Sequence, residues 1–195
     1  MEKNKVMDSV KYFDSDFNKL EQLPRVFTVN FESIEVNRKP KIKVSLNNFQ
    51  LGNLVDDNSK ENDFYRFHDI FHYTFATMLG WSPCTRSMLK RKRKSNASID
   101  EFEDGARATI TEEAISLMVF NEAKKKNFFK DQARVSRSLL NQIKEMTSSF
   151  EVAVRSKNDW ENAILKGYSL FLELVKNNGG KIHFDMLQKS VYYEN

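Results

Sequence analysis

Residues 61–122 contain most of the side chains in this chain whose types and spacing could do chemistry. His68 and His72 are four positions apart, so on a helix they would stack on one face, with Asp69 beside them. Imidazole and carboxylate groups at this spacing can share a divalent metal ion. The alternative is that both histidines are hydrogen-bonded packing residues near phenylalanines. We take His68, Asp69 and His72 as candidate catalytic residues, and Asp69 also as a candidate metal ligand.

A second acidic group lies on a predicted helix over residues 98–125. Glu112 shares one flank of this helix with Asp104, at 100° per residue. Glu113 falls instead on an apolar stripe, where a carboxylate is costly unless it is paired or binds a metal ion. An internal salt bridge is the alternative explanation. The predicted metal ligands are therefore Asp69, Asp104, Glu112 and Glu113, and Glu113 is also a candidate catalytic residue.

A basic run, residues 90–94, separates the two groups and follows Arg86 without an intervening acid. Adjacent basic and acidic clusters meet the two needs of a nucleotide–metal site, since carboxylates hold the cation and Arg or Lys neutralises phosphates. Arg86, Lys90 and Arg107 are the predicted substrate-binding residues. Two alternatives remain open, a solvated charged face and a nucleic-acid-binding segment over residues 86–94.

Composition narrows the class of protein. The chain has 195 residues and a net charge of +4, which suits one domain over residues 1–195. Cys84 is the only cysteine, so an intrachain disulfide is excluded, and we interpret Cys84 as structural. No stretch approaches the roughly 20 apolar residues of a membrane span, and the N-terminus has no apolar signal region. We therefore expect a cytoplasmic protein without a membrane partner.

Periodicity predicts the elements that would position these residues. The fold class is α+β, a mainly helical single domain with a small antiparallel β-sheet made of an N-terminal hairpin and a C-terminal strand pair. The expected strands are Val26–Val36, Ile42–Leu46, Lys181–Met186 and Gln188–Tyr192, with a turn at Asn37–Pro40. The expected helices cover residues 6–22, 62–79, 82 or 83 to about 93, 98–125 with Ser98 as the cap, 131–155 and 158–177.

Several long segments resemble the C-terminal domain found in MazG-like nucleotide pyrophosphohydrolase proteins. They are YRFHDIFHYTFATMLGWSP, LKRKRKS, EDGARATITEEAIS, LPRVFTVNFES and WENAILKGYSLFLEL, so the resemblance extends over most of the chain. It implies magnesium-dependent cleavage of nucleoside triphosphates to monophosphate and pyrophosphate. The expected cofactor is therefore Mg²⁺, with Mn²⁺ as the alternative. The usual MazG signature is Glu-Glu-x-x-Glu on one helix and Glu-x-x-Asp on another. Here Ser116 stands where the third Glu would be, and Glu101-x-x-Asp104 precedes the Glu112-Glu113 pair on the same predicted helix.

The leading hypothesis is a divalent-metal-dependent nucleotide phosphohydrolase acting on a nucleotide or another phosphate-bearing small molecule. The alternatives are a non-catalytic nucleotide-binding or regulatory module and a nucleic-acid-binding protein; a homo-oligomer is left open. Under the leading hypothesis, His68, Asp69 and His72 should converge with the acidic residues on one site. Arg86 and Lys90 should point toward that same site.

Overall fold

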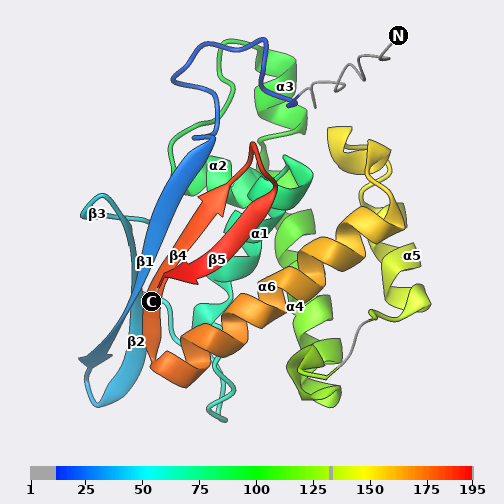
Figure 1. Cartoon of the computed structure of the whole chain (residues 1–195). Helices are drawn as coiled ribbons and strands as arrows, with labels where there is room; N and C mark the ends of the chain where they lie inside the picture. Colours follow the sequence, from blue (N-terminus) through cyan, green and yellow to red (C-terminus); the bar gives the residue numbers. More distant parts are fainter. Residues whose placement is uncertain (1–11, 132–133, 195) are drawn as a thin grey trace, which may run out of the picture.

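The fold is built on a five-stranded antiparallel sheet in the order β3-β2-β1-β4-β5. The computed structural model describes residues 12–131 and 134–194. Helices cover one face of the sheet, and the N-terminal hairpin joins the C-terminal strand pair where β1 meets β4 (Figure 1). The predicted α+β class is confirmed. The strands are β1 (Val26–Val36), β2 (Lys39–Leu46), β3 (Phe49–Gln50), β4 (Gly179–Asp185) and β5 (Ser190–Glu194).

Alternation of apolar and polar residues fixes which face of the sheet is buried. In β1, Phe27, Val29 and Phe31 are buried, whereas the side chains between them lie on the opposite, more polar face. The hairpin turn is tighter than predicted. Asn37 and Arg38 have φ values of 54° and 61°, as the two central residues of a type I′ turn require. Lys39 and Pro40 consequently belong to β2 rather than to the turn.

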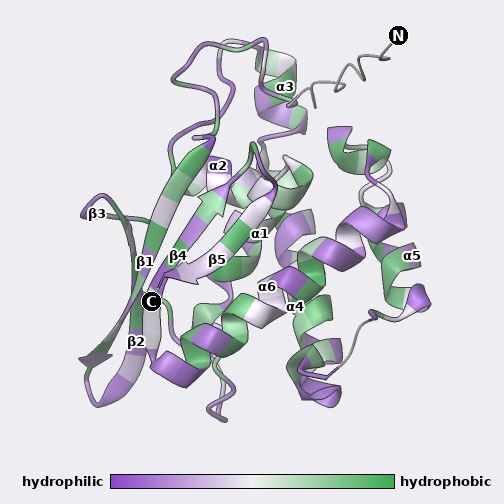
Figure 2. Cartoon of the chain, viewed as in Figure 1, coloured by the Kyte–Doolittle hydropathy of each residue, from purple (hydrophilic) through white to green (hydrophobic). Residues whose placement is uncertain are grey.

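Two helices, α1 and α6, lie against each other on the covered face of the sheet (Figure 1). The ring of Phe71 on α1 lies 4.5 Å from that of Tyr168 on α6, and a Cβ at Gly167 would lie 3.0 Å from Phe71. Figure 2 shows hydrophilic and hydrophobic residues interspersed along α5 and α6, as expected for amphipathic helices. The helices are α1 (Asp69–Leu79), α2 (Pro83–Met88), α3 (Ala97–Phe102), α4 (Ala106–Lys125), α5 (Arg137–Met146) and α6 (Lys157–Asn177), with 3₁₀ turns at Tyr65–Phe67, Asn127–Phe129 and Glu151–Val154.

The helix predicted over residues 98–125 is wrong as a single element. It is divided into α3 and α4 by residues 103–105. Asn96, rather than Ser98, caps α3, since its side chain accepts a hydrogen bond from the backbone N–H of Ile99. A Cβ at Gly105 would collide with the carbonyl oxygen of Glu101, so only glycine fits at this break. The break places α4 in its own register, independent of Glu101 and Asp104.

Four other helices differ from the prediction, among them the one over residues 62–79, where α1 begins only at Asp69 after a separate 3₁₀ turn. Residues 12–22 of the predicted first helix form turns, and residues 6–11 lie outside the described residues. The helix predicted from residue 82 or 83 to about residue 93 ends at Met88, because Lys90 takes a left-handed φ of 56°. The segment 131–155 contains α5 and a 3₁₀ turn instead of one long helix. Of the helices in the described part of the chain, none is both long enough and apolar enough to cross a membrane.

Candidate metal site

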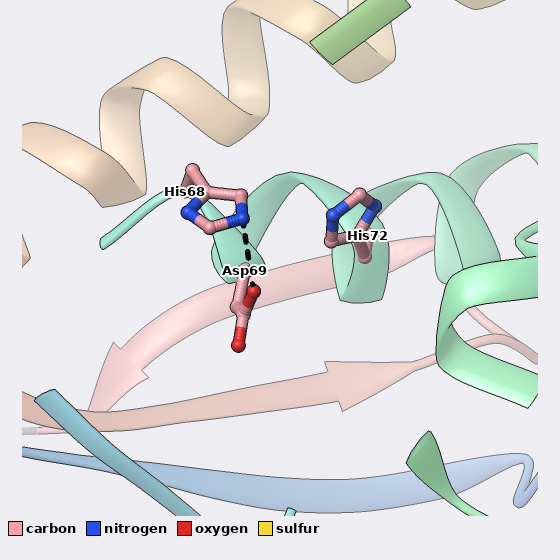
Figure 3. A group of neighbouring side chains, drawn as sticks. All are labelled: His68, Asp69 and His72. Carbon is pink, nitrogen blue, oxygen red and sulfur yellow. Dashed lines mark ion pairs between the residues drawn. The ribbon is translucent and has the colours of Figure 1, made fainter. Parts of the chain in front are cut away.

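The start of α1 brings two histidines and an aspartate together. Figure 3 shows His68 and His72 side by side along this segment, with the Asp69 carboxylate turned toward His68. Nε2 of His68 lies 3.3 Å from Oδ1 of Asp69. One ligand atom from each of the three residues lies within 4.8 Å of the other two. The predicted clustering of His68, Asp69 and His72 is therefore present in the structure.

The imidazole of His68 is held so that its Nε2 faces the aspartate. Its Nδ1 lies 2.9 Å from the carbonyl oxygen of Tyr65, and its ring stacks on the Tyr65 ring at 4.3 Å. A carbonyl only accepts, so Nδ1 carries the hydrogen and Nε2 is the lone-pair nitrogen of the neutral ring. Burial lowers the pKa of His68, which favours that neutral ring. Two acceptors, Nε2 and Oδ1 of Asp69, thus face each other, an arrangement that a bound cation stabilises.

The imidazole of His72 is anchored by a buried carboxylate on α4. Its Nδ1 lies 2.8 Å from Oε1 of Glu112, which also accepts from Oγ of Ser82 at 2.7 Å. The other oxygen of Glu112 accepts from the backbone N–H of Cys84 at 2.8 Å. These bonds occupy both carboxylate oxygens, so Glu112 orients its neighbours. Glu112, predicted as a direct metal ligand, anchors His72 in this geometry.

The second nitrogen of His72 has no hydrogen-bond partner, although it is fully buried. It lies 3.5 Å from Oε1 of Glu113. Burial lowers the pKa of His72, but the carboxylate of Glu112 at Nδ1 outweighs that effect and holds the pKa above its ordinary value. Without a cation, Nε2 therefore carries a proton directed at Glu113. A metal ion at this position would replace that proton.

Glu113 is the solvent-facing member of the group, with its side chain 46% exposed. The neighbouring imidazole of His72 lowers the pKa of Glu113 to about 2, so the carboxylate is ionised at neutral pH. The prediction that Glu113 lies on a buried apolar stripe is wrong, because Ile110 and Leu117 on that stripe are exposed. The buried face of α4 carries Glu112 instead.

Asp104 does not join this group, and its surroundings account for its burial. Its Oδ1 lies 2.6 Å from Nη2 of Arg93, and its Oδ2 accepts from the backbone N–H of Arg93 at 2.7 Å. Arg86 is also buried and points to Asp104 and to Asp14, whose Oδ2 it reaches at 3.0 Å. Arg93 pairs further with Glu151. Asp104 and Arg86, predicted as metal ligand and phosphate ligand, form a structural ion network because each is satisfied by an oppositely charged partner.

The basic run divides by residue type. Arg91 donates to the carbonyl oxygen of Lys19, and Arg93 belongs to the ion network. Lys90, Lys92 and Lys94 instead line a hollow of about 650 Å³, which we call the lysine hollow. Its other lining residues are Leu20, Glu21, Ser87 and Asp100. Lys90 lies beyond the C-terminal end of α2. Cys84, whose N–H contacts Glu112, lies near the opposite end of that helix.

Arg107, the third predicted phosphate ligand, lines a different hollow of about 330 Å³ with Glu101, Phe102, Ser149 and Phe150. The structure therefore unites His68, Asp69, His72, Glu112 and Glu113, and places Asp104, Arg86, Lys90 and Arg107 elsewhere. Sequence reasoning missed the part played by Ser82 and by the Cys84 backbone. The signal available was Ser82 followed by Pro83, a common helix start.

Comparison with known families agrees with the resemblance noted in the sequence. Residues 8–195 match the family model of the MazG C-terminal domain. The chain belongs to this family. No curated protein and no solved structure matches the chain. Membership in the MazG C-terminal domain family relates the chain to MazG proteins and leaves the chemistry to be argued from its own residues.

Proposed function

We propose that this MazG C-terminal domain holds a divalent metal ion with His68, Asp69, His72 and Glu113, and hydrolyses a phosphate anhydride or ester of a nucleotide. One observation carries the proposal. Both imidazoles are anchored through Nδ1, by Tyr65 and by Glu112, so that both Nε2 atoms are directed to the carboxylates of Asp69 and Glu113. The nucleotide as substrate is supported by the family alone.

The surroundings of the buried Nε2 atom of His72 indicate that these residues fit a metal ion. Nε2 of His72 is buried and makes no hydrogen bond of normal geometry, and the nearest carboxylate oxygen, on Glu113, lies 3.5 Å away, so a cation between the two would satisfy both groups. Two neighbouring ligands of a tetrahedral ion with bonds of about 2.1 Å lie about 3.4 Å apart. The observed separations, 3.3 Å for His68 to Asp69 and 3.5 Å for His72 to Glu113, match this value. The hydrogen bond from Glu112 to the ligand histidine is the usual support of such sites.

The ligand types also bear on which ion is bound. Magnesium takes oxygen ligands and keeps several waters, whereas imidazole suits iron, zinc and copper. The two imidazoles of His68 and His72 therefore favour a transition-metal ion over Mg²⁺ at this site. A bound ion of this kind polarises a phosphate oxygen and lowers the pKa of a water molecule.

The chain's own residues would divide the remaining work. Glu113 is ionised and half exposed, so its carboxylate is available to bind the cation from the solvent side. Asp69 is buried and holds its position next to His68. Glu112 keeps the His72 ring in one orientation from a fully buried position. The predicted phosphate ligands Arg86 and Arg107 lie outside this set, so charge neutralisation at the phosphate would depend on the cation.

The direct experiment combines calorimetry with a product assay. Mn²⁺ and a panel of nucleoside triphosphates are titrated into the full chain, and release of phosphate and pyrophosphate is measured. Binding and turnover that both disappear in Asp69→Asn and Glu113→Gln, but survive in His183→Gln, support the proposal. His183 is a suitable control because it contacts Thr28 on the opposite face of the sheet. Nucleotide binding without turnover supports a non-catalytic regulatory module instead, and absence of metal binding contradicts the proposal.

A second function, binding of a phosphate-rich ligand such as a nucleic-acid backbone, is favoured by the lysine hollow. Within the described part of the chain, Lys90, Lys92 and Lys94 make no ion pair, so their charges are available. Glu21 in the same hollow is occupied by hydrogen bonds from Ser95. A ligand bound there by phosphates would dissociate steeply as salt is raised.

A further inference from the structure

We infer that Cys84 is a further metal ligand, a thiolate that makes the proposed site selective for zinc, iron(II) or cobalt over magnesium and manganese. The inference rests on the metal site of the proposed function and assigns it one more residue and a narrower class of ion. Sulfur ligands select borderline and soft ions, whereas magnesium and manganese favour oxygen.

The thiol and the orphaned imidazole nitrogen share one neighbour. Sγ of Cys84 lies 3.6 Å from Oε1 of Glu113, and Nε2 of His72 lies 3.5 Å from the same oxygen. Ligand atoms of His72, Cys84 and Glu112 also lie within 4.8 Å of one another. Zinc–sulfur bonds are about 2.3 Å and zinc–oxygen bonds about 2.0–2.2 Å, so on a five-coordinate ion, with ligand angles of about 90–120°, these two atoms lie about 3.1–3.8 Å apart. The Cys84–Glu113 separation is that of two ligands on one ion.

The backbone of Cys84 is fixed by the same carboxylate that orients His72. Ser82 caps α2 with Pro83 in its first turn, and the N–H of Cys84 donates to Oε2 of Glu112. The other oxygen of Glu112 accepts from Nδ1 of His72. One buried side chain on α4 therefore positions both a residue of α1 and a residue of α2. Such double anchoring is what a ligand set drawn from separate elements requires.

None of the other contacts of the Cys84 thiol explains its position better than metal binding does. Besides Glu113 and His72, its polar neighbour is the carbonyl oxygen of Thr109 at 3.8 Å, a weak contact for a weak donor. A disulfide within the chain is excluded because Cys84 is the only cysteine. On metal binding the S–H bond breaks, the proton leaves to bulk water, and the electron pair on sulfur forms the bond to the ion.

Cobalt(II) provides the test, because a thiolate bound to it gives a sulfur-to-cobalt charge-transfer band in the near ultraviolet. The full chain is titrated with Co²⁺ in a buffer without added thiols, and binding is followed in parallel by calorimetry. Since the chain has a single cysteine, any such band arises from Cys84. We expect the band to appear and to saturate with the calorimetric signal. Cys84→Ser should lose the band while still binding cobalt.

Each other outcome is decisive. Calorimetric binding of cobalt without the band overturns the assignment of Cys84 and leaves the metal site of the proposed function intact. No binding of cobalt, zinc or manganese overturns both. If Cys84→Ser does not fold, X-ray absorption of the zinc-loaded parent chain decides, since a sulfur neighbour at about 2.3 Å supports the inference and a shell of only nitrogen and oxygen overturns it.

Discussion

Nδ1 of His72 lies 2.8 Å from Oε1 of Glu112, and neither side chain reaches solvent. This contact joins α1 to α4 across 40 residues of sequence. Because this contact uses Nδ1 of the imidazole, the other nitrogen, Nε2, is directed at Glu113. The adjacent acids Glu112 and Glu113 consequently differ in their surroundings, since Glu112 is a buried anchor of His72 and Glu113, the proposed ligand, is half exposed.

The first prediction compares these neighbours by the same substitution. Glu112→Gln removes a buried charge that accepts three hydrogen bonds, so we expect it to lower the unfolding free energy by about 3 kcal/mol. Glu113→Gln should change it by less than about 0.5 kcal/mol, since this side chain is half exposed, and yet abolish metal binding. Urea unfolding and metal calorimetry measure the two effects. Equal stability losses in the two variants would show that their roles are not separate.

The second prediction concerns Asp104. Asp104→Asn leaves the buried guanidinium of Arg93 without its main partner, so the unfolding free energy should fall by about 3–5 kcal/mol. Metal affinity, measured where the variant is still folded, should match that of the parent chain. The exposed Asp131→Asn serves as a control and should alter neither quantity. A stable Asp104→Asn variant that fails to bind metal would return Asp104 to the ligand set.

The third prediction is a pH dependence from Asp14. Burial alone would raise the pKa of Asp14, but hydrogen bonds from Arg25 and Leu23 and the charge of Arg86 hold it below its ordinary value. A carboxyl whose pKa is lower in the folded state stabilises the fold fully above its unfolded pKa of about 3.9, and this stabilisation is lost as pH falls through the folded pKa.

Urea unfolding of the parent chain and of Asp14→Asn between about pH 6 and pH 2 measures this effect. We expect the difference in unfolding free energy between the two proteins to shrink as the pH falls below about 4. A difference that stays constant over that range would mean that Asp14 does not titrate with folding.

The fourth prediction separates the lysine hollow from general surface charge. Replacing Lys90, Lys92 and Lys94 together by Gln should weaken binding of a single-stranded oligonucleotide or of inorganic pyrophosphate, and should reduce the salt dependence of that binding. The charge-matched control replaces the exposed residues Lys125, Lys130 and Lys176. Equal losses in the two triple variants would point to diffuse attraction by net charge.

Much of the fold was predictable because local patterns decide it. Alternation in Val26–Val36 gave the bounds of β1, and the His68–His72 spacing gave a shared helix face. Glycine at position 105 was visible in the sequence, but its collision with Glu101 is a tertiary fact, so the break between α3 and α4 was missed. Missing that break also put Asp104 in register with Glu112.

The buried face of α4 could not be chosen by periodicity. This helix carries two apolar stripes, one through Ile110 and Leu117 and the other through Ile115 and Val119, and only packing decides between them. The second stripe faces the core. The partners of the basic run were equally non-local, since Arg93 pairs with Glu151, 58 residues away. Charge type alone could not distinguish the buried arginines from the exposed lysines.

The central claim is that His68, Asp69, His72 and Glu113 hold one divalent ion. Calorimetric titration of Mn²⁺ and Co²⁺ into the parent chain, His68→Gln and His183→Gln tests it most directly. The account predicts a single site in the parent chain and in His183→Gln, and a loss of affinity of at least about tenfold in His68→Gln. Unchanged affinity in His68→Gln, or no binding by the folded parent chain, would contradict the account.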